Sequence, residues 1–206
     1  MTTRWLPLLA GAYLFGSLSF SLVVVWLLQR RDVRSVGSGN AGATNVLRAA
    51  GRLPALLVLV LDIAKGALPV VIARRWGAPE AVAALAGAAA VLGHVAPVFF
   101  AFRGGKGVAT SAGALFELFP LAALAAVVIF LAAVASTRWV SLGSLLAAGV
   151  LPLCAWLFGR LGWGRPADRQ TLAAAIAIAG VVVWRHRANL TRLIAGTERR
   201  LGEPRV

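Results

Sequence analysis

The chain has 206 residues, of which 60% are hydrophobic and 14% charged, and its mean hydropathy is +0.83. This balance lies outside the range of soluble globular domains and indicates a polytopic membrane protein. The formal net charge of +14 would suggest nucleic-acid binding in a soluble protein, but in a membrane protein basic residues gather in cytoplasmic loops beside anionic headgroups. With a single cysteine, Cys154, the chain offers neither an internal disulfide nor a cysteine-based metal site.

Long apolar runs predict the membrane-spanning helices, because about 20 helical residues cross a hydrocarbon layer about 30 Å thick. The first run, residues 5–28, is too long for the core of a signal peptide and predicts one helix. The apolar stretch 107–136 contains Glu117 and Pro120, so it is either one long helix or two. The other predicted spans are residues 54–73, 81–102, 140–158 and 171–184.

Three polar clusters, residues 29–52, 103–107 and 185–200, share one side of the membrane if they build one site. An even number of spans would place the third cluster opposite the other two. A break at Pro120, into helices 108–118 and 121–135, gives seven spans and puts all three on one face. The positive-inside rule assigns this face to the cytoplasm, with the N-terminus outside and the C-terminus inside. Against that rule, five arginines would lie outside: Arg74, Arg75, Arg160, Arg165 and Arg169.

The first cluster combines glycines with donors suited to a phosphate. Glycines allow sharp turns and let backbone N–H groups point at an anion. Hydroxyls, amides and a guanidinium supply further donors, although an ordinary turn-rich loop would explain the glycines alone. The candidate substrate-binding residues are Ser38, Gly39, Asn40, Gly42, Thr44, Asn45 and Arg48.

The second cluster is a glycine-rich turn between an aromatic helix end and a new helix. Backbone N–H groups, one lysine ammonium and a helix N-terminus can converge there on one anion. The spacing is not that of a P-loop. The candidates are Gly104, Gly105, Lys106 and Gly107.

The third cluster follows the last apolar run. If it continues that helix, His186 and Asn189 are three residues apart and share a face. For the arginines around them, at positions 187, 192, 199 and 200, contact of a basic tail with lipid headgroups is the favoured interpretation, whereas for His186 and Asn189 a site role and headgroup contact are about equally favoured. Ser141 and Ser144, one turn apart at an earlier helix junction, could add hydroxyl donors.

Two charges lie inside the second predicted span. Asp62 and Lys65 are spaced for an i,i+3 pair. Intramembrane charges are costly unless they are paired, so the sequence predicts a structural ion pair near the site.

Together the clusters resemble the three signature motifs of the bacterial acyl-phosphate:glycerol-3-phosphate acyltransferases, the PlsY family. The matching segments are residues 37–48, 93–110 and 186–198, in order, in a resemblance that covers nearly the whole chain. The chain also lacks the His-x-x-x-x-Asp box of other glycerol-phosphate acyltransferases, because Phe99 and Thr191 stand five residues after His94 and His186.

The resemblance implies a single all-α membrane enzyme domain, residues 1–206, in the bacterial plasma membrane. It implies transfer of a fatty acyl group from acyl phosphate to the sn-1 hydroxyl of glycerol 3-phosphate, which gives lysophosphatidic acid and phosphate. No metal, cofactor or nucleic acid is expected. The partners are the two substrates and membrane lipid, and a peripheral acyl-phosphate synthase is a further candidate.

Residue roles also follow from the resemblance. Ser38, Arg48, Lys106 and Asn189 are expected to bind glycerol 3-phosphate, with His186 and Ser144 near the acyl phosphate. The expected catalytic residues are His186, Lys106 and Asn189. The proton acceptor is either His186 or the substrate's own phosphate, and we favour the latter. The alternative function is an organic-phosphate transporter, which would typically show internal repeats and a midplane site; we find no convincing repeat.

Overall fold

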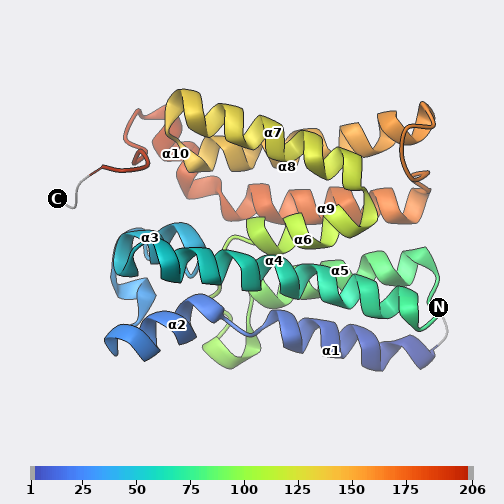
Figure 1. Cartoon of the computed structure of the whole chain (residues 1–206), viewed down its shortest axis with the longest axis horizontal. Coiled ribbons are helices and arrows are strands. Elements are labelled where there is room, and N and C mark those ends of the chain that lie inside the picture. The colour runs from blue at the N-terminus through green and yellow to red at the C-terminus, as the bar shows by residue number, and fades with distance from the viewer. Residues whose placement is uncertain (1–2, 204–206) are drawn as a thin grey trace. The chain divides into compact units, whose positions relative to one another are not determined.

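A computed structural model describes residues 3–203, and every regular element in that range is a helix (Figure 1). Five helical segments are long and apolar enough to cross a membrane: Thr3–Gln29, Arg52–Arg75, Glu80–Phe100, Pro120–Thr137 and Val140–Arg160. A sixth candidate is the pair Arg169–Arg185 and Arg187–Ile194, which is bent by 56°. Val108–Leu118 is a shorter apolar helix. The predicted all-helical membrane architecture is confirmed, and so is the helix break before Pro120.

The chain divides into two compact units, residues 1–117 and 118–206. The first unit contains η1 (Thr3–Trp5), α1 (Leu6–Gly16), α2 (Phe20–Gln29), η2 (Val33–Ser35), α3 (Ala43–Ala50), α4 (Arg52–Arg75), α5 (Glu80–Val95), η3 (Val98–Phe100) and nearly all of α6 (Val108–Leu118). The second contains α7 (Pro120–Thr137), α8 (Val140–Arg160), α9 (Arg169–Arg185) and α10 (Arg187–Ile194).

Glycines set the helix spacing in the first unit. A Cβ on Gly16 would overlap the backbone of Ala90, and one on Gly93 would overlap that of Tyr13, so α1 and α5 cross at backbone contact. Gly66 and Gly113 bring α4 and α6 equally close. Small residues drive such close approach in membranes, where lipid chains are as apolar as leucine and packing has to supply the attraction.

The first predicted span is broken rather than continuous. Helix α1 ends at Gly16 and α2 begins at Phe20. The intervening Ser19 has φ −90° and ψ 88°, and the Ser17 hydroxyl donates to the Tyr13 carbonyl at 2.9 Å. Such local bonds offer the backbone an alternative to the helix. The span predicted over residues 5–28 is present within Thr3–Gln29, but it consists of two helices rather than one.

In the second unit α7 and α8 form a hairpin that turns at Arg138, and α9 packs against α8. The segment after α10 returns to this turn, where the Leu201 N–H donates to the Arg138 carbonyl at 2.7 Å. Helix α9 ends at Arg185, and the chain bends at His186 before α10. The condition under which His186 and Asn189 would share a face of one straight helix with α9 is therefore not met.

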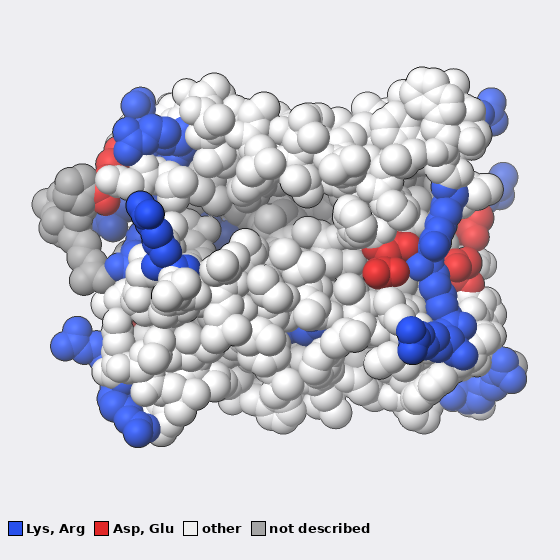
Figure 2. Space-filling view, in the orientation of Figure 1, with Lys and Arg blue, Asp and Glu red and all other residues white. Residues whose placement is uncertain are grey.

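Charges gather at the ends of the helices. Lys and Arg side chains lie mainly where helices begin or end, and the helix surfaces between them are white (Figure 2). Apolar helix surfaces of this kind suit hydrocarbon chains, and the basic helix ends suit headgroups.

Candidate active site

Asn45 organises the first polar cluster. Its side chain is buried, and its Oδ1 accepts the Ser38 N–H at 2.9 Å. Its amide nitrogen donates to the carbonyls of Val33 and Val36 at 2.7 and 3.0 Å. A Cβ on Gly37, where φ is +62°, would overlap the same amide, so only glycine fits there. The Asn45 amide therefore holds the loop that presents Ser38, which is itself exposed.

The second cluster is fixed by backbone bonds to the end of α5. The Gly104 N–H donates to the Val95 carbonyl at 3.3 Å, and the Gly105 N–H donates to the His94 carbonyl at 3.1 Å. Gly104, Gly105 and Gly107 are buried, whereas Lys106 between them is half-buried. The turn thus presents the lysine from a closely packed glycine backbone.

The structure brings the first two clusters together. A Cβ on Gly105 would overlap the His94 imidazole and come within 2.5 Å of the Ala41 carbonyl. Gly105 therefore lies between the two loops with no room for a side chain. Arg34 Nη1 joins them again by donating to the Arg103 carbonyl at 3.2 Å. Arg48 and Lys106, both half-buried, are cations of this region, and Arg34 and Arg103 lie beside them.

The other predicted residues lie in the second unit, at the end where α7 turns into α8. His186 is buried, and its Nδ1 lies 2.8 Å from the Val182 carbonyl. Because a carbonyl only accepts, Nδ1 carries the proton in the neutral ring and Nε2 is left as the basic nitrogen.

Asn189 is held by a carboxylate. Its amide nitrogen donates to Glu198 Oε1 at 2.6 Å, and Arg192 Nε donates to the other oxygen at 2.7 Å. Burial raises the pKa of Glu198, but the hydrogen bonds from its neighbours, with Asn189 foremost and the Arg192 charge in support, outweigh burial and lower that pKa overall. The charged carboxylate therefore fixes the Asn189 amide in one orientation.

Ser141 and Ser144 are both buried on α8, against which α10 packs. The Ser144 hydroxyl donates to the Val140 carbonyl at 2.8 Å, so its proton is committed to the helix backbone. The structure thus places Ser141, Ser144, His186 and Asn189 in one unit and the glycine-rich clusters in the other.

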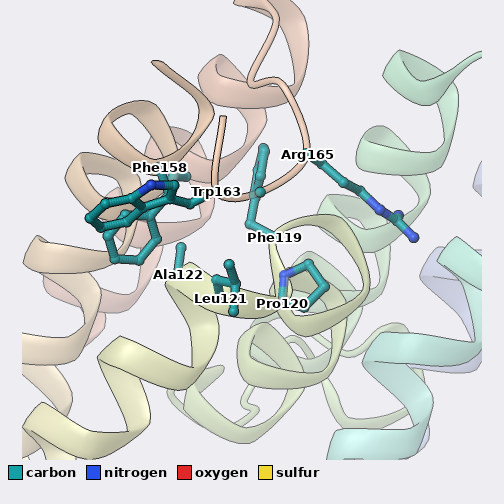
Figure 3. A pocket seen from close by; sticks show the side chains of 9 residues that line it. Phe119, Pro120, Leu121, Ala122, Phe158, Trp163 and Arg165 are labelled. Atoms are coloured by element: carbon teal, nitrogen blue, oxygen red, sulfur yellow. The ribbon is translucent and has the colours of Figure 1, made fainter. Parts of the chain in front are cut away.

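A cavity of about 190 Å³ lies elsewhere in the second unit, at the start of α7 and the end of α8. Its walls are mostly apolar, with Arg165 at one side (Figure 3), and none of the predicted site residues lines it. Among residues 3–203, His, Cys, Asp and Glu side chains form no group able to hold a metal ion.

A model of the family described as glycerol-3-phosphate acyltransferase matches residues 6–196. The chain belongs to this family. It is 48% identical over 193 residues to the glycerol-3-phosphate acyltransferase of Shouchella clausii (strain KSM-K16), with 93% of each chain covered. To that of Halalkalibacterium halodurans it is 45% identical, with 98% of this chain and 97% of the relative covered.

This acyltransferase is also similar in structure to a protein of known crystal structure. The crystal structure of PlsY, an integral membrane glycerol 3-phosphate acyltransferase in its glycerol 3-phosphate form, matches with a TM-score of 0.87 and 41% identity. The match covers 97% of this chain and 96% of that one. The lysophosphatidic acid form of PlsY matches with a TM-score of 0.83 and 39% identity. Family membership decides for an enzyme over the organic-phosphate transporter.

The sequence predicted the candidate site residues of this acyltransferase but not the residues that hold them in place. His94 was noted only as part of a motif, yet its ring packs against Gly105. The predicted Asp62 and Lys65 ion pair is confirmed, with Nζ and Oδ1 2.7 Å apart. The sequence feature that could have identified His94 as a supporting residue is its position directly after Gly93, at the end of an apolar helix that leads to the glycine-rich turn.

Proposed function

We propose that this acyltransferase moves a fatty acyl group from acyl phosphate to the sn-1 hydroxyl of glycerol 3-phosphate, releasing lysophosphatidic acid and phosphate. The observation that carries the proposal is the contact of Gly105 with Ala41, which joins two glycine-rich loops beside Arg48 and Lys106. Such a region, rich in cations, N–H groups and hydroxyls, is electrostatically suited to phosphorylated substrates. PlsY, the similar solved protein, has been crystallised in glycerol 3-phosphate and lysophosphatidic acid forms.

Each predicted residue keeps a role in this proposal. Ser38, Arg48 and Lys106 bind glycerol 3-phosphate in the first unit, and Asn45 supports the loop that carries Ser38. His186 and Ser144 serve the acyl phosphate, Ser144 by turning its hydroxyl proton from the Val140 carbonyl to the anion. Asn189 contributes its amide to glycerol 3-phosphate. The remaining proposed contacts are the backbones of Gly39, Gly42, Gly104, Gly105 and Gly107 and the side chains of Asn40, Thr44 and Ser141.

The chemistry needs no acyl-enzyme, because acyl phosphate is a mixed anhydride with a good leaving group. The glycerol hydroxyl attacks the acyl carbon directly, and phosphate departs. Lys106 and the Gly107 N–H stabilise the oxyanion that develops, a contact worth about 3–4 kcal/mol of barrier when one donor is removed. Substrate phosphate takes the hydroxyl proton in our preferred version. His186 is the alternative base, and its Nε2 has the required lone pair.

For the membrane arrangement we propose seven crossings in the bacterial plasma membrane, with α6 as a short one and with the site facing the cytoplasm. The N-terminus is then outside, and a peripheral acyl-phosphate synthase could deliver the donor from the cytoplasm. Arg165→Cys and Arg103→Cys, each in a Cys154→Ala background, test this with an impermeant maleimide. Labelling of residue 165 from the cytoplasmic side alone would refute the arrangement, and labelling of residue 103 from that side is expected.

The reaction is tested by phosphate release from palmitoyl phosphate and glycerol 3-phosphate with the detergent-purified protein. Release should require both substrates, yield lysophosphatidic acid and be abolished by Lys106→Ala. Arg103→Ala is the matched control, because Arg103 is an exposed cation in the same turn with no assigned role. A folded preparation that releases no phosphate, or equal losses in both variants, would contradict the proposal.

A further inference from the structure

A charged pair lies buried halfway along α4. The side chains of Lys65 and Asp62 are 0% and 2% exposed, and Nζ lies 2.7 Å from Oδ1. Replacing such a pair by apolar residues is often neutral or stabilising, because desolvation offsets the attraction. Within a membrane, buried charges of this kind mark function by default. The pair therefore calls for an explanation beyond helix packing.

Lys65 reaches out of its own helix. Its ammonium donates to the Leu18 carbonyl at 2.8 Å and lies 5.3 Å from the centre of the Phe20 ring. Leu18 lies in the break between α1 and α2, where its carbonyl is outside both helices. A broken membrane helix has to satisfy its freed backbone groups from neighbouring elements. Lys65 thus ties the break to the middle of α4.

Asp62 faces the opposite neighbour, α5. Its Oδ1 lies 3.7 Å from Nδ1 of His94, whose side chain is 6% exposed. The other side of the same imidazole packs against Gly105, where a Cβ would overlap Nε2. The His94 carbonyl also accepts the Gly105 N–H at 3.1 Å. His94 therefore contacts both the buried ion pair and the glycine-rich turn.

A second set of bonds ties the helix break to the same region. The Tyr13 hydroxyl donates to the Ala96 carbonyl at 2.8 Å, and the Ser17 hydroxyl lies 3.4 Å from the Val98 N–H. Both partners belong to the segment that leads from α5 into the turn. The break, the buried pair and the turn are thus one connected structure within the first unit.

We propose that Asp62, Lys65 and His94 are positioning residues for the turn Gly104–Gly107. Lys65 fixes the α1–α2 break against α4, and Asp62 orients the His94 imidazole. The imidazole in turn fixes the position of the Gly105 backbone relative to α5. The adjacent Lys106 is thereby held in its working position. The role deepens the proposed function, since it assigns these residues a share in the binding of glycerol 3-phosphate.

Hydrogen exchange and kinetics on the full-length protein in detergent test the role. In His94→Ala the amides of residues 103–107 should exchange faster while those of α4 and α5 stay protected. The kcat/KM for glycerol 3-phosphate should fall by about a hundredfold, since misplacement by about 1 Å is enough for such a loss. Val70→Ala is the control, because Val70 is also buried and packs on Gly87 of α5, away from the turn.

A second variant guards against misfolding. Asp62→Asn with Lys65→Met removes both charges together, so no unpaired charge is left buried, and it should show the same local exchange and the same kinetic loss. Wild-type turnover measured in parallel tests the reaction separately. Unchanged exchange in residues 103–107 would overturn the positioning role, as would His94→Ala kinetics that match Val70→Ala. Loosening spread evenly over α4 and α5 would also overturn it, in favour of plain helix packing.

Discussion

Asn45→Ala should loosen the loop over residues 33–42 without unfolding the protein. The substitution removes the acceptor of the Ser38 N–H and both donors to the Val33 and Val36 carbonyls. A hydrogen bond contributes about 1 kcal/mol net, so the three together stabilise the closed loop by about 3 kcal/mol. Since 1.4 kcal/mol is tenfold, the open fraction of the loop should rise about a hundredfold.

Hydrogen exchange of a peptide that covers residues 33–40 measures this opening, because amide protection in a local unit follows its opening free energy. Thr44→Ala is the matched control for the exchange rate only, because Thr44 is a half-buried neighbour on the same helix and is itself a proposed substrate contact. The KM for glycerol 3-phosphate should rise in Asn45→Ala as the exchange rises. If KM rose while exchange of the loop stayed at the wild-type rate, Asn45 would be a direct substrate ligand and the reasoning would fail.

Gly16→Ala should lower the thermal unfolding midpoint in detergent by the equivalent of about 1–3 kcal/mol, because its Cβ would enter the backbone of α5, whereas Gly11→Ala, with open space around it, should not. Asp168→Ala should cost about 1 kcal/mol as a lost helix cap. Hydrogen bonds that Asp168 accepts from N–H groups at the start of α9 lower its pKa. The stability difference between wild type and Asp168→Ala should therefore be complete above the ordinary carboxyl pKa and vanish as pH falls through the lowered pKa of Asp168. Equal unfolding midpoints at neutral pH would refute the cap. Glu198→Ala should cost about 2 kcal/mol by freeing Asn189 from a charged acceptor, seen as a lower midpoint together with lower turnover.

The helix pattern was readable because apolar runs and Pro120 dominate this sequence. Residues 108–118 were predicted as a helix, and α6 has those bounds. The break at residues 17–19 escaped notice because Leu18 and its neighbours keep the run apolar and only two serines mark it. Lys65 stabilises the break, and its bond to the Leu18 carbonyl joins residues 47 positions apart. No local pattern contains that information.

The chemistry of the candidate site was predictable, but which residues support the loops and which are exposed donors was less so. Glycine, lysine and arginine in the first two clusters suggested phosphate, and the fold brings those clusters together at Gly105. Asn45 had the same polar character as Ser38, so sequence could not tell a support from an exposed donor. Burial makes the distinction, because Asn45 is 1% exposed and its amide is committed to the loop. The bend at His186 likewise has no marker, since histidine is permitted inside helices.

The close spacing of Asp62 and Lys65 bears on how the protein enters the bilayer. A single acidic or basic residue at the centre of a helix raises the insertion free energy by about 2.5–3.5 kcal/mol. Because these two side chains are three residues apart on α4, their ion pair needs only the helix itself to form. Helix α4 can therefore pass from the translocon into lipid with its charges already neutralised against each other. The first span is synthesised earlier, and its Leu18 carbonyl gains the Lys65 ammonium as a partner only once α4 has been made. This order makes α4 the element that completes α1 and α2.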